Sequence, residues 1–173
     1  GEGIVDIIFH VASVPAGART FGGYIARPDA LGQWPTVMVF DPEPIPTSAI
    51  KHICRVLARH GIAAFAPDLT ESVTKNQMIS RAVAAHLQKP AGVWSNGQHG
   101  VGGLAFGRGL VDAAVLTATD PKVDAWAAVG ANLDEEVVAN LAEPETEGLV
   151  ILSRADESTD VDTSIGYKDT LQQ

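Results

Sequence analysis

One glycine-rich stretch, Ser95 to Gly103, contains residues whose types and spacing could support chemistry. It holds four glycines in nine residues and lies between two apolar patches, a pattern that favours a sharp turn from a strand into a helix. Such a turn exposes the side chain at its tip, where a Ser or Cys could attack a carbonyl carbon. Here Gly100 lies at the predicted tip and His99 precedes it. The sequence therefore predicts the shape of a nucleophile's turn without a nucleophilic side chain at its tip.

Two side chains near this turn are alternative candidates for catalysis. Ser95 lies in the segment 93–97, which partly matches Gly-x-Ser-x-Gly, but Val93 replaces the first glycine where a tight turn needs a small residue. The alternative interpretation of Ser95 is a serine that hydrogen-bonds the backbone at a strand end. His99 could contact a ligand or a partner, or could simply fill space as a polar side chain. As a general base it would need a nucleophile within hydrogen-bonding reach.

The other residues that could bind a metal or a cofactor, or act as a nucleophile, are predicted to have structural roles. Cys54 follows Ile53 on the apolar side of a predicted helix, where a thiol packs as a small hydrophobic group. The His residues form no pair four positions apart with a nearby carboxylate, so we expect no metal site. The glycine pairs at 22–23 and 102–103 lack the Gly-x-Gly-x-x-Gly pattern between a strand and a helix. We therefore expect no dinucleotide, and no other cofactor is indicated.

The elements that would position these residues alternate between buried strands and amphipathic helices. Short apolar runs bounded by Gly, Pro or Asp are typical of strands that are buried on both faces. Apolar residues at helical spacing follow them, and Thr47 or Ser48 can cap the first helix. The alternation predicts a single α/β domain over residues 1–173 with a mostly parallel sheet. Strands are predicted first at 4–14 and 22–28. The predicted parallel strands are 36–40, 63–66, 92–95, 124–129 and 149–152. The predicted helices are 48–60, 78–87, one through 110–115, and 135–141.

Composition and charge narrow the class of protein further. The chain has 173 residues, 46% of them apolar and 19% charged, a composition typical of one globular domain. Its net charge of −9 comes without a cluster of Lys and Arg, which argues against a nucleic-acid partner. No apolar segment is long enough to span a bilayer, so we expect no membrane partner. The single cysteine excludes an internal disulfide and indicates a reducing cytoplasm.

Five segments between about Phe21 and Asp156 occur in an order that is typical of one protein family. They read GGYIARPDALGQWPTVMVFD, ICRVLARHGIAAFAPDL, GVGGLAFG, VDAWAAVG and LVILSRADES. This series resembles the dienelactone hydrolase family of α/β-hydrolases. The resemblance implies an α/β-hydrolase-like three-layer sandwich, with helices on both faces of a mostly parallel sheet. It also implies a Cys or Ser nucleophile that acts with an Asp and a His on an ester or lactone bond.

Placing the family's site on this sequence leaves the nucleophile's position without a side chain. The family's turn reads Gly-Phe-Cys-x-Gly-Gly, and its last two glycines match Gly102 and Gly103. The resemblance then puts Gly100 at the nucleophile, with His99 and Val101 on either side as candidate binding residues. Glycine offers no side-chain atom that could attack a carbonyl carbon.

The remaining positions of the family's site match only in part. Asp156 matches the acid that follows the late strand. The family's base is a His later in the chain, and residues 157–173 contain none. Pro42 stands where the family carries a Glu beside the oxyanion hole, and Glu43, one position later, is a further candidate binding residue. The resemblance therefore implies a degenerate, C-terminally short member in which two of the three catalytic groups are missing.

Two classes of function follow from this interpretation. The first is a non-catalytic subunit, scaffold or binding module that works with a protein partner or by self-association. The short polar segment after Asp156 could expose a sheet edge that a second copy covers; alternatively, this tail folds back on its own chain. The second class is an active ester or lactone hydrolase that takes a small ester- or lactone-like ligand. Its site would be rearranged or completed by a partner.

Overall fold

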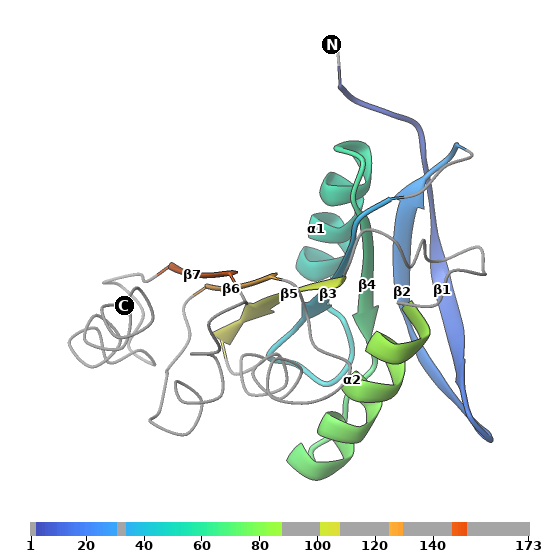
Figure 1. The fold of residues 1–173 in the computed structure, drawn as a ribbon, viewed down its shortest axis with the longest axis vertical. Coiled ribbons are helices and arrows are strands. Elements are labelled where there is room, and N and C mark those ends of the chain that lie inside the picture. The colour runs from blue at the N-terminus through green and yellow to red at the C-terminus, as the bar shows by residue number, and fades with distance from the viewer. Residues whose placement is uncertain (1–2, 31–33, 88–100, 108–124, 130–146, 152–173) are drawn as a thin grey trace.

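The computed structural model describes residues 3–30, 34–87, 101–107, 125–129 and 147–151, and its strands form one sheet (Figure 1). The order across this seven-stranded sheet is β1-β2-β4-β3-β5-β6-β7. The strands are β1 (Ile7–Ala16), β2 (Arg19–Pro28), β3 (Thr36–Phe40), β4 (Ala63–Pro67), β5 (Val101–Phe106), β6 (Ala125–Val129) and β7 (Glu147–Ile151). The two helices in the described residues are α1 (Ser48–Arg59) and α2 (Val73–Leu87). Strand β5 therefore lies inside the sheet, between β3 and β6.

The sheet is mixed, with a large parallel part and an antiparallel edge. Strands β4, β3, β5, β6 and β7 are parallel neighbours in that order. Strands β1 and β2 form an antiparallel hairpin, and β2 also pairs antiparallel with β4. In Figure 1, β1, β2 and β4 stand almost upright whereas β6 and β7 run across the view. This rotation along the sheet is the twist that is usual for such sheets.

Helix α1 covers one face of the sheet. Thr47 caps its first turn, because the Thr47 hydroxyl oxygen accepts a hydrogen bond from the N–H of Ile50. The helix ends shortly before Gly61, whose φ of +84° lies in the left-handed region that glycine favours. Ile50, Cys54 and Ala58 recur every four residues and are buried. Their partners on β2 and β4 are Tyr24, Ala26, Ala64 and Ala66.

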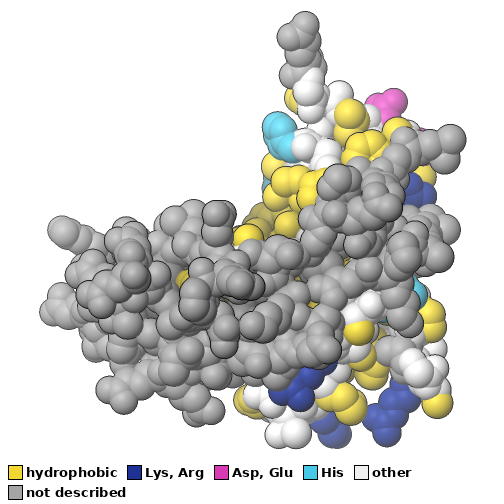
Figure 2. Space-filling view, viewed as in Figure 1, with side chains coloured by type: hydrophobic (Ala, Val, Ile, Leu, Met, Phe, Trp, Pro, Cys, Tyr) yellow, Lys and Arg dark blue, Asp and Glu magenta, His cyan; other side chains and the backbone are white. Residues whose placement is uncertain are grey.

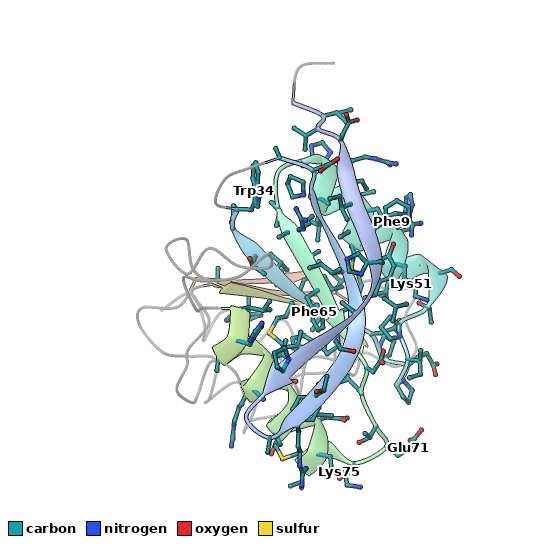
Figure 3. All side chains as sticks on the ribbon, turned by 90° about the vertical axis from the view of Figure 1, so that its right-hand side faces the viewer. Phe9, Trp34, Lys51, Phe65, Glu71 and Lys75 are labelled. Carbon is teal, nitrogen blue, oxygen red and sulfur yellow. The ribbon has the colours of Figure 1, made fainter. Side chains whose placement is uncertain are left out.

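Helix α2 covers the opposite face. Side chains alternate along a strand, so the neighbours of the α1-facing residues point away from α1. Ile25 and Phe65 are directly paired and buried on this opposite face. The buried apolar residues of α2 are Ile79, Val83 and Leu87. Figure 3 shows the two helices on opposite sides of the strands. Helices on both faces of a mostly parallel sheet confirm the predicted three-layer α/β architecture.

Most of the predicted elements that fall on described residues are confirmed. The parallel strands predicted near 36–40, 63–66, 124–129 and 149–152 are β3, β4, β6 and β7, and those predicted at 4–14 and 22–28 correspond to β1 and β2. The predicted strand at 92–95 and the predicted helices at 110–115 and 135–141 lie outside the described residues. Neither α1 nor α2 has the length and apolar character that a membrane-spanning helix requires.

The prediction that Gly102 and Gly103 open a helix is wrong, because both lie inside β5. Gly103 pairs with Met38 of β3 on one side and with Trp126 of β6 on the other. Its missing side chain leaves room between two large neighbours, which is a common reason for glycine within a strand. The turn that follows this strand therefore begins after Phe106.

Candidate functional site at the carboxyl ends of the central strands

The carboxyl ends of β3, β4 and β5 meet at one edge of the sheet. These strands are parallel neighbours, and Phe40 at the end of β3 pairs with Ala105 near the end of β5. The residues that directly follow the three strands are Asp41, Asp68 and Gly107. In α/β sheets, ligands bind outside the carboxyl ends of parallel strands. We therefore treat this edge as the candidate site.

Gly107 has the backbone of a sharp turn. It directly follows β5 and has a φ of +55°, in the left-handed region. Residues with a Cβ adopt this region at a cost of about 1–2 kcal/mol. A Cβ built at Gly107 would lie 3.4 Å from Cβ and 3.6 Å from Cγ of Pro42. These are close to ordinary contacts, so the turn could hold a small side chain but has none. A sharp turn directly after a central strand is where α/β-hydrolases carry their nucleophile.

Asp41 fixes the loop that brings Pro42 to Gly107. Its carboxylate is buried and accepts three hydrogen bonds. Oδ1 accepts from the backbone N–H of Glu43 at 2.9 Å. Oδ2 accepts from the backbone N–H and from the hydroxyl group of Thr47, each at 2.8 Å. Because Thr47 caps α1, one carboxylate ties the end of β3 to the start of the helix.

Asp68 follows β4 and has a perturbed acidity. Its backbone N–H donates to the carbonyl oxygen of Gly22 at 3.0 Å, and a Cβ on Gly22 would lie 2.6 Å from Oδ2 of Asp68. Partial burial raises the pKa of the Asp68 carboxyl group, while the charge of Lys51 acts in the opposite direction. The N–H of Leu69 donates to the carbonyl oxygen of Pro44 at 2.6 Å. This bond holds the loops after β3 and β4 together at the site.

The described part of the chain offers neither a metal site nor a reactive thiol. No group of three His, Cys, Asp or Glu side chains in it is arranged to hold a metal ion. Cys54 is fully buried on the sheet-facing side of α1, and this burial raises its pKa to about 12. Its thiol therefore stays protonated near neutral pH, as expected of a packed core residue.

The structure places two of the residues that the sequence indicated for the site. Glu43 lies beside it, with an exposed side chain and a backbone N–H bonded to Asp41. Val101 is the first residue of β5 and pairs with Thr36. At a rise of about 3.3 Å per residue it lies about 20 Å from Gly107, at the other end of the strand. The indicated residues that fall outside the described part of the chain are Ser95, His99, Gly100 and Asp156.

Sequence reasoning missed Gly107 and Asp41. A signal for Gly107 was present, because an apolar run ends there and Gly109 follows. In this register Phe106 matches the Phe of Gly-Phe-Cys-x-Gly-Gly, Gly107 falls at the Cys, and Gly109 matches the next glycine. Ala105 and Leu110 stand at the first and last glycines of the pattern. Asp41 gave no comparable signal, because a carboxylate six residues before a capping Thr47 is not a recognised spacing.

The arrangement of strands and helices is that of an α/β-hydrolase fold, and solved structures of dienelactone hydrolase-like proteins have a similar fold. A candidate dienelactone hydrolase from Klebsiella pneumoniae has a TM-score of 0.78 and 20% identity, over 96% of this chain and 81% of that chain. A dienelactone hydrolase-like promiscuous phosphotriesterase from metagenomic libraries has a TM-score of 0.76 and 18% identity, over 96% and 77%. An α/β serine hydrolase homologue from Coxiella burnetii has a TM-score of 0.73 and 14% identity, over 95% and 83%.

The sequence itself gives no such matches. No family model matches it, and no curated protein matches it. The TM-scores of 0.73 to 0.78 show a shared fold, and identities of 20% or less limit the finding to the fold. They confirm the fold that the resemblance implied, and the activity has to be inferred from the residues at the site.

Proposed function

We propose that this chain is a non-catalytic protein with a dienelactone-hydrolase-like fold, which acts as a binding module or subunit. The observation that supports this proposal is Gly107. It directly follows β5 and has the left-handed backbone of a nucleophile's turn, but it has no side chain. In the family's pattern this position, next to Phe106, belongs to the nucleophilic Cys. A backbone group does not replace the attacking atom.

The size of the expected loss favours a non-catalytic role over a weakened enzyme. The nucleophile, base and acid of a hydrolase act as a unit, and loss of the nucleophile alone lowers kcat by roughly a millionfold in a serine protease. What remains after such a loss is the backbone of the site and its capacity to bind. A partner protein could supply a base, but it would not restore an attacking atom at Gly107.

We propose that the site edge that remains holds a small ligand. The missing side chain of Gly107 leaves space beside Pro42, whose loop is fixed by the bonds of Asp41. The similar folds include a phosphotriesterase and a cold-adapted esterase. By this likeness, we propose a small ester- or lactone-like molecule as the ligand class for this chain.

Hydrolysis of an activated ester such as 4-nitrophenyl acetate tests the proposal. We expect the purified chain to release nitrophenol no faster than serum albumin at the same concentration. Ser95→Ala is the matched variant for the alternative function, an active ester or lactone hydrolase with a rearranged site. A saturable turnover that disappears in Ser95→Ala would establish that alternative and make Ser95 the nucleophile.

Thiol labelling of Gly107→Cys tests the geometry of the site separately. Cys54 is buried and protonated, so the native protein should react slowly with iodoacetamide near neutral pH. A thiol at Gly107 would lie at the candidate site edge and should react at least about tenfold faster. The background variant Cys54→Ala assigns the label to the new thiol. Labelling of Gly107→Cys that is as slow as labelling of Cys54 would show that the turn does not open onto a ligand site.

A further inference from the structure

Strand β1 leaves one of its backbone edges without a strand partner in the described part of the chain. All ten of its residues, Ile7 to Ala16, pair with β2 on the inner side, and β1 is the last strand at this end of the sheet. Edge strands are usually protected against pairing by charged side chains, proline, bulges or short length. β1 is long, residues 7–16 contain no Asp, Glu, Lys or Arg, and their one proline, Pro15, is the second-last residue of the strand. Its outer edge therefore lacks the charges that would discourage pairing with another strand.

The α1 side of this strand also exposes apolar side chains. Phe9 pairs with Ala26 and Val11 pairs with Tyr24, so both project on the face that α1 covers farther along the sheet. Phe9 keeps 51% of its surface exposed and Val11 keeps 74%. Figure 3 shows Phe9 at this open side of the hairpin. Adjacent exposed apolar side chains on one strand are typical of a protein-binding surface.

Two cations lie beside these apolar side chains. The guanidinium carbon of Arg55 lies 5.5 Å from the ring centre of Phe9, and Arg55 donates a hydrogen bond to the Tyr24 hydroxyl at 3.0 Å. Nζ of Lys51 lies 5.6 Å from the ring centre of Tyr24. Within the described residues neither cation forms an ion pair with a carboxylate, although the charge of Lys51 reaches Asp68 at longer range.

The edge and the cations are held in a fixed relation to each other. The backbone N–H of Val5 donates to the carbonyl oxygen of Arg59 at 3.1 Å, which ties the start of β1 to the end of α1. Helix α1 carries Lys51, Arg55 and Arg59 but no Asp or Glu. The surface therefore combines backbone groups that can pair, apolar side chains and positive charge.

We propose that the outer edge of β1 binds an extended segment of a partner protein in which apolar and acidic residues alternate with polar ones. This segment adds a strand to the sheet. Its apolar side chains pack beside Phe9 and Val11, and its carboxylates bind Arg55 and Lys51. The inference goes beyond the proposed function, because β2, β4 and β3 separate this edge from the turn after β5. It holds whether or not the chain hydrolyses a substrate.

A partner protein fits this edge better than a second copy of the chain. Pairing of β1 with β1 of another copy about a two-fold axis would place both α1 helices on the same face of the joined sheet. Lys51 and Arg55 of the two copies would then face each other across the junction, and β1 supplies no carboxylate to neutralise them. Like charges in this position oppose association, whereas an acidic strand is complementary to it.

The probe for this proposal is a blocked, fluorescent ten-residue peptide. Threonine occupies every second position, and valine and glutamate alternate at the others. We expect saturable binding to the full chain in fluorescence anisotropy, with an affinity that falls as salt is added. A peptide with lysine in place of glutamate should bind at least about tenfold more weakly. A glutamate peptide with N-methylated backbone amides should not bind, because it cannot pair with a strand edge.

Three variants of the chain test whether the binding occurs at this surface. Val11→Glu adds a charge that repels the acidic peptide, and it should weaken binding at least about tenfold. Val73→Glu, on the exposed start of α2, is the matched control and should leave binding unchanged.

Arg55→Gln tests whether the positive charge of Arg55 contributes to binding. Circular dichroism checks that each variant is folded. The proposal is overturned by equal binding of the glutamate and lysine peptides, by no saturable binding, or by full affinity in Val11→Glu. A dimer in light scattering that Val11→Glu dissolves would instead assign the edge to a second copy.

Discussion

Pro42 and Gly107 lie against each other across the carboxyl ends of β3 and β5, where a Cβ on Gly107 would be 3.4 Å from the Cβ of Pro42. By the resemblance, the first position would carry a Glu beside the oxyanion hole, and the register set by Phe106 puts the nucleophilic Cys at the second. Neither residue here has a side chain that could take part in hydrolysis. The two residues are nevertheless in close proximity, and the bonds of Asp41 fix the loop that carries Pro42. This combination supports our proposal of a site that binds without reacting. The space-filling view in Figure 2 shows the surface of the described residues, with several Lys and Arg side chains at its lower end.

The backbone of the turn can be tested with Gly107→Ala. We expect a loss of about 1–2 kcal/mol in the free energy of unfolding, because a residue with a Cβ is strained at a φ of +55°. Gly61→Ala is the matched control. Gly61 also has a left-handed φ, of +84°, and a Cβ there would meet no atom within 4 Å, so this variant measures the backbone strain alone. Urea denaturation of both variants gives the comparison. A loss at Gly61 without a loss at Gly107 would show that the turn after β5 is not left-handed.

The role of the Asp41 carboxylate can be tested with Asp41→Asn. The amide nitrogen of Asn accepts no hydrogen bond, so at least one of the three bonds to Glu43 and Thr47 is lost. We expect a loss of about 2–3 kcal/mol, the size usual for hydrogen bonds to a buried charge. Glu43→Gln, an exposed neighbour, should change stability by less than about 0.5 kcal/mol. Equal stabilities of the two variants in urea denaturation would refute this role.

The elements defined by local pattern could be predicted from the sequence. α1 follows from the helical spacing of its apolar residues and from a capping Thr47 or Ser48, which are all local signals. The apolar residues are Ile50, Ile53, Val56 and Leu57. Gly103 shows where reasoning from local sequence fails. Glycine occurs both in turns and in strands beside a large neighbouring side chain, and the local sequence does not distinguish the two. The neighbour that decides between them is in β6, which is distant in sequence.

The site was harder to predict than the fold for a related reason. Its geometry depends on the path of the loop after β3, which brings Pro42 to the end of β5. The bonds that fix this path join Asp41 to Thr47, and no periodicity indicates them. The family pattern, aligned on Gly102 and Gly103, puts the nucleophile at Gly100; because this glycine pair lies inside β5, we propose Gly107 for that position instead.

The pH dependence of stability tests the environment of Asp68. Burial raises its folded pKa above the ordinary value of 3.8, so the neutral carboxyl group is favoured in the folded state. The resulting stability is present below 3.8 and is lost as the pH rises through the higher folded pKa. We expect urea denaturation of Asp68→Asn to show a smaller loss of stability than the wild type over this acidic window. Glu71→Gln controls for the removal of an exposed carboxylate. Parallel pH profiles for Asp68→Asn and the wild type would contradict the prediction.

Alkaline stability tests the burial of Cys54. Its thiol has a folded pKa of about 12 against an ordinary value of 9.0, because burial opposes the thiolate. In the unfolded chain the thiol ionises near 9.0, so the stability that the buried thiol contributes is present below this pH and is lost as the pH rises toward 12. Cys54→Ala removes the contribution of this thiol to the pH dependence of stability, whereas the other groups that titrate at alkaline pH remain. The difference in unfolding free energy between the wild type and Cys54→Ala should therefore shift in favour of the variant above pH 9.0. A difference that stays constant across this range would show that the Cys54 thiol is not buried in the native protein.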